Sequence, residues 1–529
     1  MQTLNSELNK NLIERVAIGD MLRRRARDSA HQQALVDFVD GERRSLNYRE
    51  FNSQVNRLVG GLRNQNLQQG DVLALLCSNR IEFMLFAFAC YKSGIVFMPV
   101  NFLQNPEDIR YNFEHAKVSA VVFEPNLAKL ALSCATDLEH IRVKIQIGTQ
   151  VTEGCVNSQT LIDHGNDTEI EDVIIQDRDV AQLLYTSGTT SRPKGVETSH
   201  LSLYFASLSN PLSMEFHRFH NHLIVLPVFH CAALALGFAT MQMGGKLVLK
   251  SGFEPLEILD TIESELINGS CMLPVMWKAL LQIPELEKRD LSSLEFGMYA
   301  MAAMDRDSID RLCDSFNCKF VLASGQSEFT PGTCVFNEAS PTENREGNYW
   351  GEPTVSTDQA IIDEQGNELP AGEVGEICWR GPQVMSRYLN NSEATAEVSQ
   401  FGWHHSGDLG LIDSEGQLLF VDRKKDMIKT GGENVASSKV ESVLLSHPSI
   451  LQVAVFAVPH PQWGEAVCSA VQLIPGEPLD EKSIIEHCQQ SLAGFQIPKR
   501  IFKVNSFPQT GTGKIQKAEL RKQYASSFE

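Results

Sequence analysis

The sequence lacks the features that mark several classes of protein. Its 12 cysteines are scattered from Cys77 to Cys488 without one Cys-x-x-Cys pair, so we expect neither a disulfide framework nor a zinc ribbon. Cysteines used in this way are typical of the reducing cytoplasm, which is the compartment we predict. Residues 1–16 contain no continuous apolar run, so we expect no signal peptide there.

Long apolar runs and an excess of positive charge are also missing. The most apolar stretch, residues 81–100, is interrupted by Glu82, Lys92, Gly94 and Pro99, so no transmembrane segment is predicted. Lys and Arg total 46 against 66 Asp and Glu, which gives a formal net charge of −20. A chain of this sign repels phosphate backbones, so we expect no nucleic-acid partner.

The sequence does contain the pattern of a large layered domain. Its 529 residues allow about three or four folding units of roughly 150 residues each. Strand-length apolar segments alternate with helix-length ones, and these predict an α/β fold with a mainly parallel sheet. The segments are, in order, residues 72–77, 81–91, 95–98, 106–115 and 120–123.

The composition changes near residue 422. A charge cluster over residues 422–426 is closely followed by a pair of glycines, after which short strand and helix patterns resume. We therefore predict a hinge at residues 423–426. It would separate a large N-terminal region of layered mixed α/β subdomains, residues 1–422, from a small α+β C-terminal domain, residues 427–529.

The strongest local motif is a loop rich in hydroxyls and glycine that follows a predicted strand at residues 180–184. Its polar members are Thr186, Ser187, Gly188, Thr189, Thr190 and Lys194. Such a loop offers many donors to phosphate oxygens. It is not a Walker loop, because Pro193 stands where that motif has glycine, and Ser187 lacks the flanking glycines of a nucleophile elbow. On these residues alone, an ordinary polar surface loop is an equal alternative.

This loop resembles the phosphate-binding loop of the adenylate-forming superfamily, which comprises acyl-CoA synthetases, carrier-protein adenylation domains and firefly-type luciferases. Further segments resemble that superfamily's motifs in the same order, and the resemblance extends from about residue 20 to residue 520. They are LPVFH at 226–230, SGQSE at 324–328, GWHHSGD at 402–408, DRKKD at 422–426, GGEN at 431–434 and GTGK at 511–514. The resemblance is greatest to the AMP-forming acyl-CoA ligases.

The resemblance implies a reaction between a carboxylic acid, ATP and coenzyme A. The acid would first form an acyl-adenylate with release of pyrophosphate, and the acyl group would then pass to CoA with release of AMP. In the superfamily, the positions of Thr186 to Thr190 and Lys194 cradle the leaving phosphates. The position of Glu328 holds Mg²⁺, a hard cation that takes oxygen ligands.

The same resemblance assigns roles near the predicted hinge. Asp408 would accept hydrogen bonds from the ribose hydroxyls, and Arg423 would donate to the ribose and the α-phosphate. Lys514 would place its ammonium between the attacking carboxylate and the α-phosphate, so that Lys514, Glu328 and Thr186 form the catalytic group. The C-terminal domain would be mobile and rotate about Lys425 between the two half-reactions.

The remaining matched positions line the nucleotide, acid and CoA sites. Those implied for the nucleotide are Ser324, Gly325, Gln326 and Ser327. Those implied for the acid and the CoA passage are His230, Ala300, Met301, Ala302, Gly431, Gly432 and Glu433. Ser324 stands where the superfamily has a tyrosine that packs on adenine, and a serine supplies no aromatic face. Met301 and Met304 add volume to the expected acid wall, so we predict a small to medium acid rather than a long chain.

Alternatives to this interpretation remain at the level of sequence. Taken singly, Glu328, Asp408 and Lys514 fit caps, turns or an exposed hairpin better than a site, and only their ordered occurrence reverses that balance. A stand-alone enzyme that loads a carrier protein is the second functional hypothesis. The third is a degenerate homologue that binds nucleotide or acyl ligands without turnover, and a homodimer stays open in each case.

Overall fold

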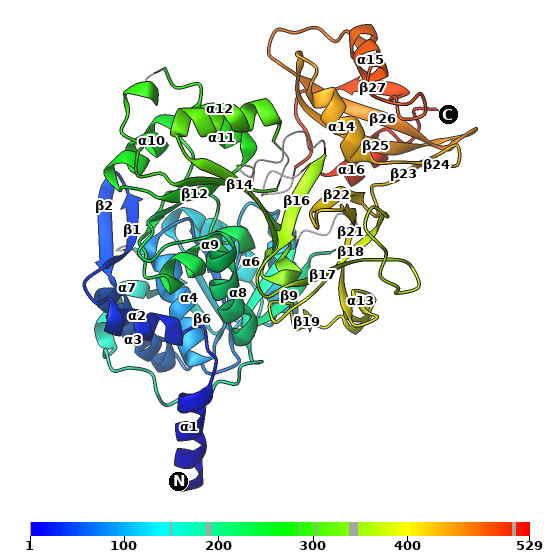
Figure 1. The fold of residues 1–529 in the computed structure, drawn as a ribbon. Coiled ribbons are helices and arrows are strands. Elements are labelled where there is room, and N and C mark those ends of the chain that lie inside the picture. Colours follow the sequence, from blue (N-terminus) through cyan, green and yellow to red (C-terminus); the bar gives the residue numbers. More distant parts are fainter. Residues whose placement is uncertain are drawn as a thin grey trace.

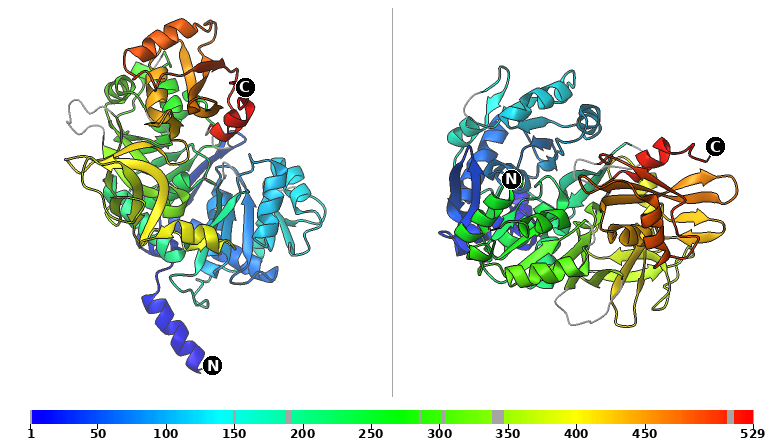
Figure 2. Two further views of the ribbon diagram at one scale, coloured as in Figure 1. Left: turned by 90° about the vertical axis from the view of Figure 1, so that its right-hand side faces the viewer. Right: turned by 90° about the horizontal axis from the view of Figure 1, so that it is seen from above.

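The computed structural model describes residues 2–148, 151–186, 192–284, 286–301, 304–337, 347–509 and 515–528. Within these ranges the strands form sheets of fourteen, eight and five strands. Figure 1 shows the five-stranded sheet at the C-terminal end, beside the larger part of the chain. The predicted α/β fold, with a large N-terminal region and a smaller C-terminal part, is confirmed. Figure 2 shows helix α1 (Gln2–Glu14) projecting from the body of the molecule.

The eight-stranded sheet contains the first predicted elements. Strand β3 (Val72–Leu76) pairs in parallel with β4 (Val96–Pro99) and β5 (Ala120–Phe123). Helix α4 (Ile81–Ser93) is buried on nearly every side and ends at Gly94, whose φ of 72° favours glycine. The other elements of this layer are α5 (Pro106–His115), α6 (Ala128–Ala135), β6 (Val143–Gln146), β7 (Val156–Asn157), α7 (Ser158–His164), β8 (Val180–Thr186), β9 (Lys194–Ser199) and β19 (Arg387–Tyr388).

The fourteen-stranded sheet is parallel in one part and antiparallel in the other. Its parallel part includes β10 (His222–Ile224), β11 (Leu247–Leu249), β12 (Gly269–Met272), β13 (Phe296–Tyr299) and β14 (Lys319–Gly325). The sheet continues from β14 through antiparallel strands, which are β15 (Gly332–Asn337), β16 (Asn348–Pro353), β17 (Asp358–Ile362), β18 (Gly375–Arg380), β20 (Ser399–Gln400), β21 (Trp403–Ile412) and β22 (Leu418–Arg423). Strands β1 (Gln33–Val39) and β2 (Glu42–Asn47) close the other edge.

The largest apolar core lies where helices pack against both of these sheets. Helix α4 and helix α9 (Cys231–Gln242) join a cluster that includes Phe97 of one sheet and Phe296 of the other. Other helices of this region are α2 (Asp20–Asp28), α3 (Tyr48–Asn64), α8 (His200–Ser213), α10 (Pro255–Ser264), α11 (Pro274–Leu280), α12 (Arg306–Phe316) and α13 (Ser392–Glu397). Among the described residues, no helix has both the length and the apolar character needed to cross a bilayer.

The five-stranded sheet begins just after β22 and has a core of its own. Its elements are β23 (Ile428–Thr430), β24 (Glu433–Val435), α14 (Ser437–Leu445), β25 (Ile450–His460), β26 (Gly464–Leu473), α15 (Glu481–Gln489), β27 (Arg500–Lys503) and α16 (Lys517–Gln523). Its apolar cluster is made of residues that follow Met427 in the chain. The predicted hinge at residues 423–426 begins at the last residue of β22, and its other three residues lie between β22 and β23.

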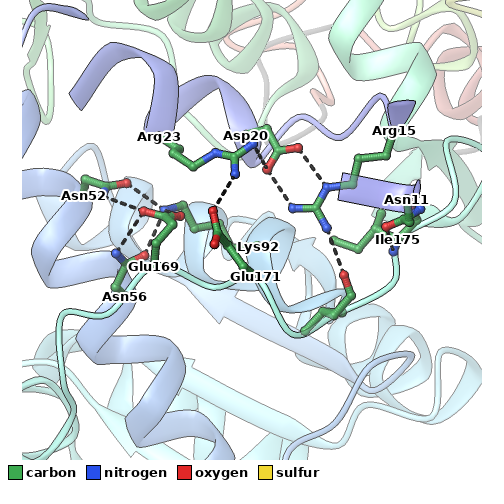
Figure 3. Close-up of polar contacts among 11 residues, drawn as sticks. Asn11, Arg15, Asp20, Arg23, Asn52, Asn56, Lys92, Glu169, Glu171 and Ile175 are labelled. Carbon is green, nitrogen blue, oxygen red and sulfur yellow. Dashed lines mark hydrogen bonds and ion pairs between the residues drawn. The ribbon is translucent and has the colours of Figure 1, made fainter. Parts of the chain in front are cut away.

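Ion pairs tie the N-terminal helices to the connection that precedes β8. In Figure 3, Arg15 and Arg23 lie on either side of Asp20, with Arg15 Nη2 2.8 Å from Asp20 Oδ1. The buried Lys92 ammonium contacts Glu169 Oε1 at 2.5 Å and the side chains of two asparagines. Burial raises the pKa of the Glu169 carboxyl, but the Lys92 charge and hydrogen bonds outweigh burial and lower that pKa overall.

Asn79 holds the two larger sheets together at the ends of their strands. It follows β3 of the first sheet, and its amide Nδ2 donates to Leu226 O and Lys250 O, each at 3.0 Å. Its Oδ1 accepts from the Val228 amide at 2.8 Å. These three partners belong to the segments that follow β10 and β11. A single buried side chain therefore fixes the start of the segment that leads to His230.

We predict that Asn79→Ala destabilises the protein. The substitution leaves buried backbone groups without partners, at about 1 to 3 kcal/mol for each group. Urea unfolding followed by tryptophan fluorescence measures the effect. The control is Asn64→Ala, because Asn64 is exposed at the end of α3 and should change stability by less than about 0.5 kcal/mol. Equal stability of the two variants would contradict the role given to Asn79.

Candidate active site

Glu328 lies in a short 3₁₀ helix, η3 (Ser327–Phe329), directly after β14. Its backbone oxygen accepts from the Met385 amide at 2.8 Å, and its carboxylate Oε1 accepts from the Tyr388 hydroxyl at 2.8 Å. The Tyr388 ring also lies beneath Lys194, with 4.7 Å between the ammonium nitrogen and the ring centre. One tyrosine therefore links the lysine of the predicted phosphate loop to the predicted metal ligand.

Tyr388 is fixed by its backbone as well as by its side chain. It belongs to the two-residue strand β19, which pairs with β9, so that Tyr388 lies opposite Val196. The side chain is buried, and burial together with the Glu328 carboxylate raises the pKa of its phenol. The hydroxyl therefore keeps its proton and acts as a donor to Glu328. Sequence reasoning missed this residue, because a lone tyrosine in so short a strand matches none of the recognised motifs.

The turn that carries Glu328 requires glycine at its start. A Cβ on Gly325 would lie 1.5 Å from the carbonyl oxygen of Pro331. The Gln326 amide donates to that same oxygen at 3.1 Å, and the Thr330 hydroxyl donates to Gln383 O at 2.6 Å. These contacts fold residues 325–331 back on themselves and direct Glu328 toward Tyr388.

His404 connects two of the predicted nucleotide motifs. Its Nε2 lies 3.3 Å from Gln326 Nε2, which joins β21 to the turn after β14. The ring is buried, and burial lowers the pKa of His404 to about 4, so the imidazole is neutral at pH 7. Ser324, the position expected to face adenine, is half-buried at the end of β14 and its carbonyl accepts from the Thr333 hydroxyl at 3.2 Å.

Asp408 and Arg423 lie directly opposite each other on β21 and β22. Arg423 Nε is 3.7 Å from Asp408 Oδ1, so the two charges form an ion pair at the point where β22 leaves the sheet. The next residue, Lys424, donates from its amide to Gly407 O at 2.9 Å and from its ammonium to Glu376 Oε2 at 3.1 Å. The structure therefore brings the two predicted ribose ligands together.

His230 caps the N-terminus of α9, next to Cys231, which lines a small cavity. Its Nδ1 accepts from the Ala232 amide at 3.3 Å and lies 3.8 Å from Cys231 Sγ, which in turn is 3.4 Å from the Ser327 hydroxyl. Burial raises the pKa of the Cys231 thiol, but the His230 imidazole outweighs burial and lowers that pKa overall. The cavity is lined by Gln182, Leu184, Thr198, Leu203, Ala206, Cys231, Leu234, Ala235, Phe238, Ser327, Thr330 and Pro331.

The methionines expected on the acid wall do not line this cavity. Met301 follows β13 with a left-handed φ of 68° and is 46% exposed, whereas Ala300 before it is buried. Met304 packs instead against the apolar cluster around Trp277 and Phe316. The argument that these methionines reduce the space for the acid therefore does not apply to the cavity beside Ser327.

The other predicted site residues belong to separate parts of the chain. Gly431 and Gly432 form the exposed turn between β23 and β24 with φ of 59° and 92°, and Glu433 begins β24. They are thus part of the third sheet, whereas Thr186 ends β8 of the first. Six predicted residues lie outside the described ranges, and these are Ser187, Gly188, Thr189, Thr190, Ala302 and Lys514.

A larger surface cleft, of about 530 Å³, lies elsewhere and contains none of the predicted site residues. Its lining comes from α2, α3 and the connection before β8 and consists of Arg23, Arg24, Ala26, Arg27, Arg49, Asn52, Ser53, Asp167, Glu169 and Glu171. Several of these side chains belong to the ion-pair network in Figure 3.

Comparison with known proteins gives matches over nearly the whole chain. The family model "AMP-binding enzyme" matches residues 22–389, and the model "AMP-binding enzyme C-terminal domain" matches residues 439–514. A feruloyl-CoA synthase from an Amycolatopsis species is 33% identical over 502 residues, which cover 95% of this chain and 98% of that protein. A long-chain-fatty-acid–CoA ligase from Mycobacterium tuberculosis is 28% identical over 96% of this chain and 99% of its own length.

Solved structures show the same architecture. The o-succinylbenzoate CoA synthetase from Bacillus subtilis, solved with its acyl-adenylate intermediate, superposes with a TM-score of 0.83 at 25% identity, and 95% of this chain and 97% of that one are covered. A fatty acyl CoA synthetase from Mycobacterium tuberculosis gives a TM-score of 0.77 at 27% identity, with 97% and 99% covered.

We predict that Gly325→Ala displaces the turn that carries Glu328. The added methyl group cannot occupy the position of the Pro331 oxygen, so the turn must open, at about 1 to 3 kcal/mol of unfolding free energy. The measurement is the urea midpoint of the variant. Gly494→Ala is the matched control, because a Cβ on Gly494 would meet no atom within 4 Å. A Gly325 variant as stable as that control would show that the turn tolerates a side chain.

Proposed function

This chain belongs to the AMP-binding enzymes and is an AMP-forming acyl-CoA ligase, and we propose that the residues around Glu328 carry out its chemistry. Its substrates are ATP, CoA and a carboxylic acid, which first becomes an acyl-adenylate and then a thioester. The observation that carries the residue assignment is the contact series from Lys194 through Tyr388 to Glu328. This series places the Lys194 ammonium, the Tyr388 phenol and the Glu328 carboxylate side by side. An ammonium suits the triphosphate, and a carboxylate suits the Mg²⁺ that accompanies it.

On the phosphate side, we assign Lys194 to the phosphate oxygens and Glu328 to Mg²⁺. Carboxylate oxygens are the ligands that Mg²⁺ prefers, and Tyr388 orients the carboxylate through Oε1. When bound, the cation neutralises charge on the departing pyrophosphate. Lys194 stays close to that position because its ammonium packs on the Tyr388 ring.

On the nucleoside side, Asp408 supplies the acceptor for the ribose hydroxyls and Arg423 supplies a donor beside it. The two already face each other across β21 and β22, so binding does not require a change of strand register. Gln326 and the neutral His404 lie next to Ser324 and offer polar groups to the base. The apolar cavity beside Ser327 has a volume of only about 10 Å³, room for about one water molecule, so an acyl group could enter there only if the lining moves. A small to medium acid requires the least movement, and this is the acid size that we propose.

The first prediction that follows from this assignment concerns the overall reaction. With ATP, Mg²⁺ and CoA, a panel of aryl and short-chain to long-chain acids should give pyrophosphate and an acyl-CoA, with the highest kcat/KM for a small or medium acid. Adding or removing one methylene should change binding by only about 1 to 3 kcal/mol, so the series must span many carbons. Activity that rises steadily to palmitate would contradict the proposed acid size. Pyrophosphate release without thioester would instead indicate a carrier-protein acceptor.

A second prediction separates the roles of two carboxylates. Asp408→Ala should weaken ATP binding at every Mg²⁺ concentration, because it removes the ribose acceptor. Glu328→Ala should lose activity that added Mg²⁺ partly restores, because it removes a metal ligand. The measurement is pyrophosphate release against Mg²⁺, with the exposed Glu139→Ala as control. The same Mg²⁺ response in both variants would contradict this division.

A third prediction concerns the two half-reactions. Adenylation needs Lys514 at the α-phosphate, whereas thioester formation needs room for the CoA thiol in the same place. Lys514→Ala should therefore lose adenylation yet still convert supplied acyl-adenylate and CoA to thioester. The exposed Lys482→Ala is its control.

Lys425→Pro tests the hinge in the same assay. Proline fixes φ at Lys425, so thioester formation should slow more than adenylation, whereas Lys425→Ala should retain both steps. Rapid-quench measurement of each half-reaction decides the outcome. Equal slowing of both halves in Lys514→Ala, or unimpaired thioester formation in Lys425→Pro, would contradict the proposed rotation.

A further inference from the structure

Two histidines and a glutamate meet at the amino ends of strands β10 and β13 of the fourteen-stranded sheet, away from the site described above. His217 and His220 lie in the turn between α8 and β10, and Glu295 directly precedes β13. One ligand atom from each of the three lies within 4.8 Å of the other two. The turn and β13 are about 75 residues apart in sequence, so the cluster is a product of the fold.

His220 is the buried member, and its Nε2 faces the Glu295 carboxylate. Its Nε2 lies 3.2 Å from Glu295 Oε2, and among the described residues it has no hydrogen-bond partner of acceptable geometry. The ring is held from the other side, where Nδ1 accepts from the His217 amide at 3.3 Å, and it packs near Phe216.

Glu295 is oriented by a neighbouring amide. The Asn268 Nδ2 donates to Glu295 Oε1 at 3.1 Å, and Asn268 Oδ1 accepts from the Asn221 amide at 2.7 Å. Asn268 thus fixes the carboxylate to the same turn that carries the histidines. Support of this kind, in which a second residue orients a ligand, is characteristic of protein metal sites.

We propose that His217, His220 and Glu295 form a binding site for a divalent cation of the zinc class. Two imidazole nitrogens and one carboxylate oxygen suit Zn²⁺, and water would complete a tetrahedron at about 2.0 to 2.2 Å from the metal. His217 and Glu295 are exposed, so they can move the short distance that coordination requires. Binding through His220 Nε2 places the ring proton on Nδ1 and gives up the long contact from the His217 amide.

The position of the cluster indicates a structural role. Strands β10, β12 and β13 run in parallel, with His222, Gly269 and Phe296 in register at their amino ends. Glu328, in contrast, follows the carboxyl end of β14, which is parallel to β13. The cation would therefore join the amino end of β10 to that of β13, whereas the candidate active site lies at the carboxyl ends of the parallel strands. It would stabilise the protein because it binds the folded state and not the unfolded one.

The test uses the full-length protein, stripped with a chelator and titrated with Zn²⁺ in the absence of nucleotide. Calorimetry should show one tight site in the unmodified protein, and Zn²⁺ should raise its melting temperature. His217→Ala and Glu295→Gln should each weaken this site by at least about tenfold and remove most of the temperature gain. Both changes are at exposed positions, so the variants should fold. Co²⁺ should give a visible absorption spectrum that the same variants lose.

The control is His31→Ala, which removes an exposed histidine outside the cluster and should bind Zn²⁺ as the unmodified protein does. A site that survives unchanged in His217→Ala and Glu295→Gln would overturn the proposal. Absence of tight Zn²⁺ binding by the unmodified protein would overturn it as well. Because neither readout is ligase activity, these outcomes are independent of whether the assigned catalytic residues are correct.

Discussion

The hydrogen bond from Tyr388 to Glu328 is the contact on which the candidate site depends, because it joins the two large sheets. Tyr388 belongs to the eight-stranded sheet through its pairing with β9, whereas Glu328 follows β14 of the fourteen-stranded sheet. The Met385 amide adds a backbone bond to Glu328 O across the same junction. A ligand that contacts Lys194 and Glu328 must therefore lie between two layers that are already fixed relative to each other, which is the preorganisation that phosphoryl chemistry needs.

The negative charge of the chain requires that cations be held in place at the site. The chain carries a net charge of −20, yet both substrates that meet in the first half-reaction are anions. The protein as a whole does not attract them, so the attraction must come from a few cations held in place locally. Lys194 is held by the Tyr388 ring and Arg423 by Asp408, and each pairing keeps its cation aimed without neutralising it fully. In the proposed assignment, Asp408 would exchange its contact with Arg423 for the ribose hydroxyls.

Much of the fold could be predicted from the sequence, and the exceptions have physical causes. Helix α5 has its predicted bounds because Pro106 stands at its first turn and Asn105 caps it, signals that depend on neighbouring residues only. Tyr388 and the cluster of His217, His220 and Glu295 were missed because their contacts form only when segments distant in sequence come together in the fold. The left-handed φ of 68° at Met301, whose side chain is 46% exposed, could not be predicted either, because a pattern of residue types does not encode backbone angles of this kind.

The contacts on either side of Lys425 explain why a proposed rotation would centre there. Lys424 is bonded to Gly407 and Glu376 of the fourteen-stranded sheet, whereas Asp426 forms an ion pair with Arg521 of α16 at 2.7 Å. Lys425 lies between these two neighbours, and the turn around it is closed by the Asp426 and Met427 amides, which donate to Arg423 O at 2.9 and 3.1 Å. A rotation there would have to break the hydrogen bond from the Ser437 amide to the buried Asp422 carboxylate, which crosses between β22 and α14. That bond opposes rotation, so it would stabilise this arrangement until binding of a substrate favours the other one.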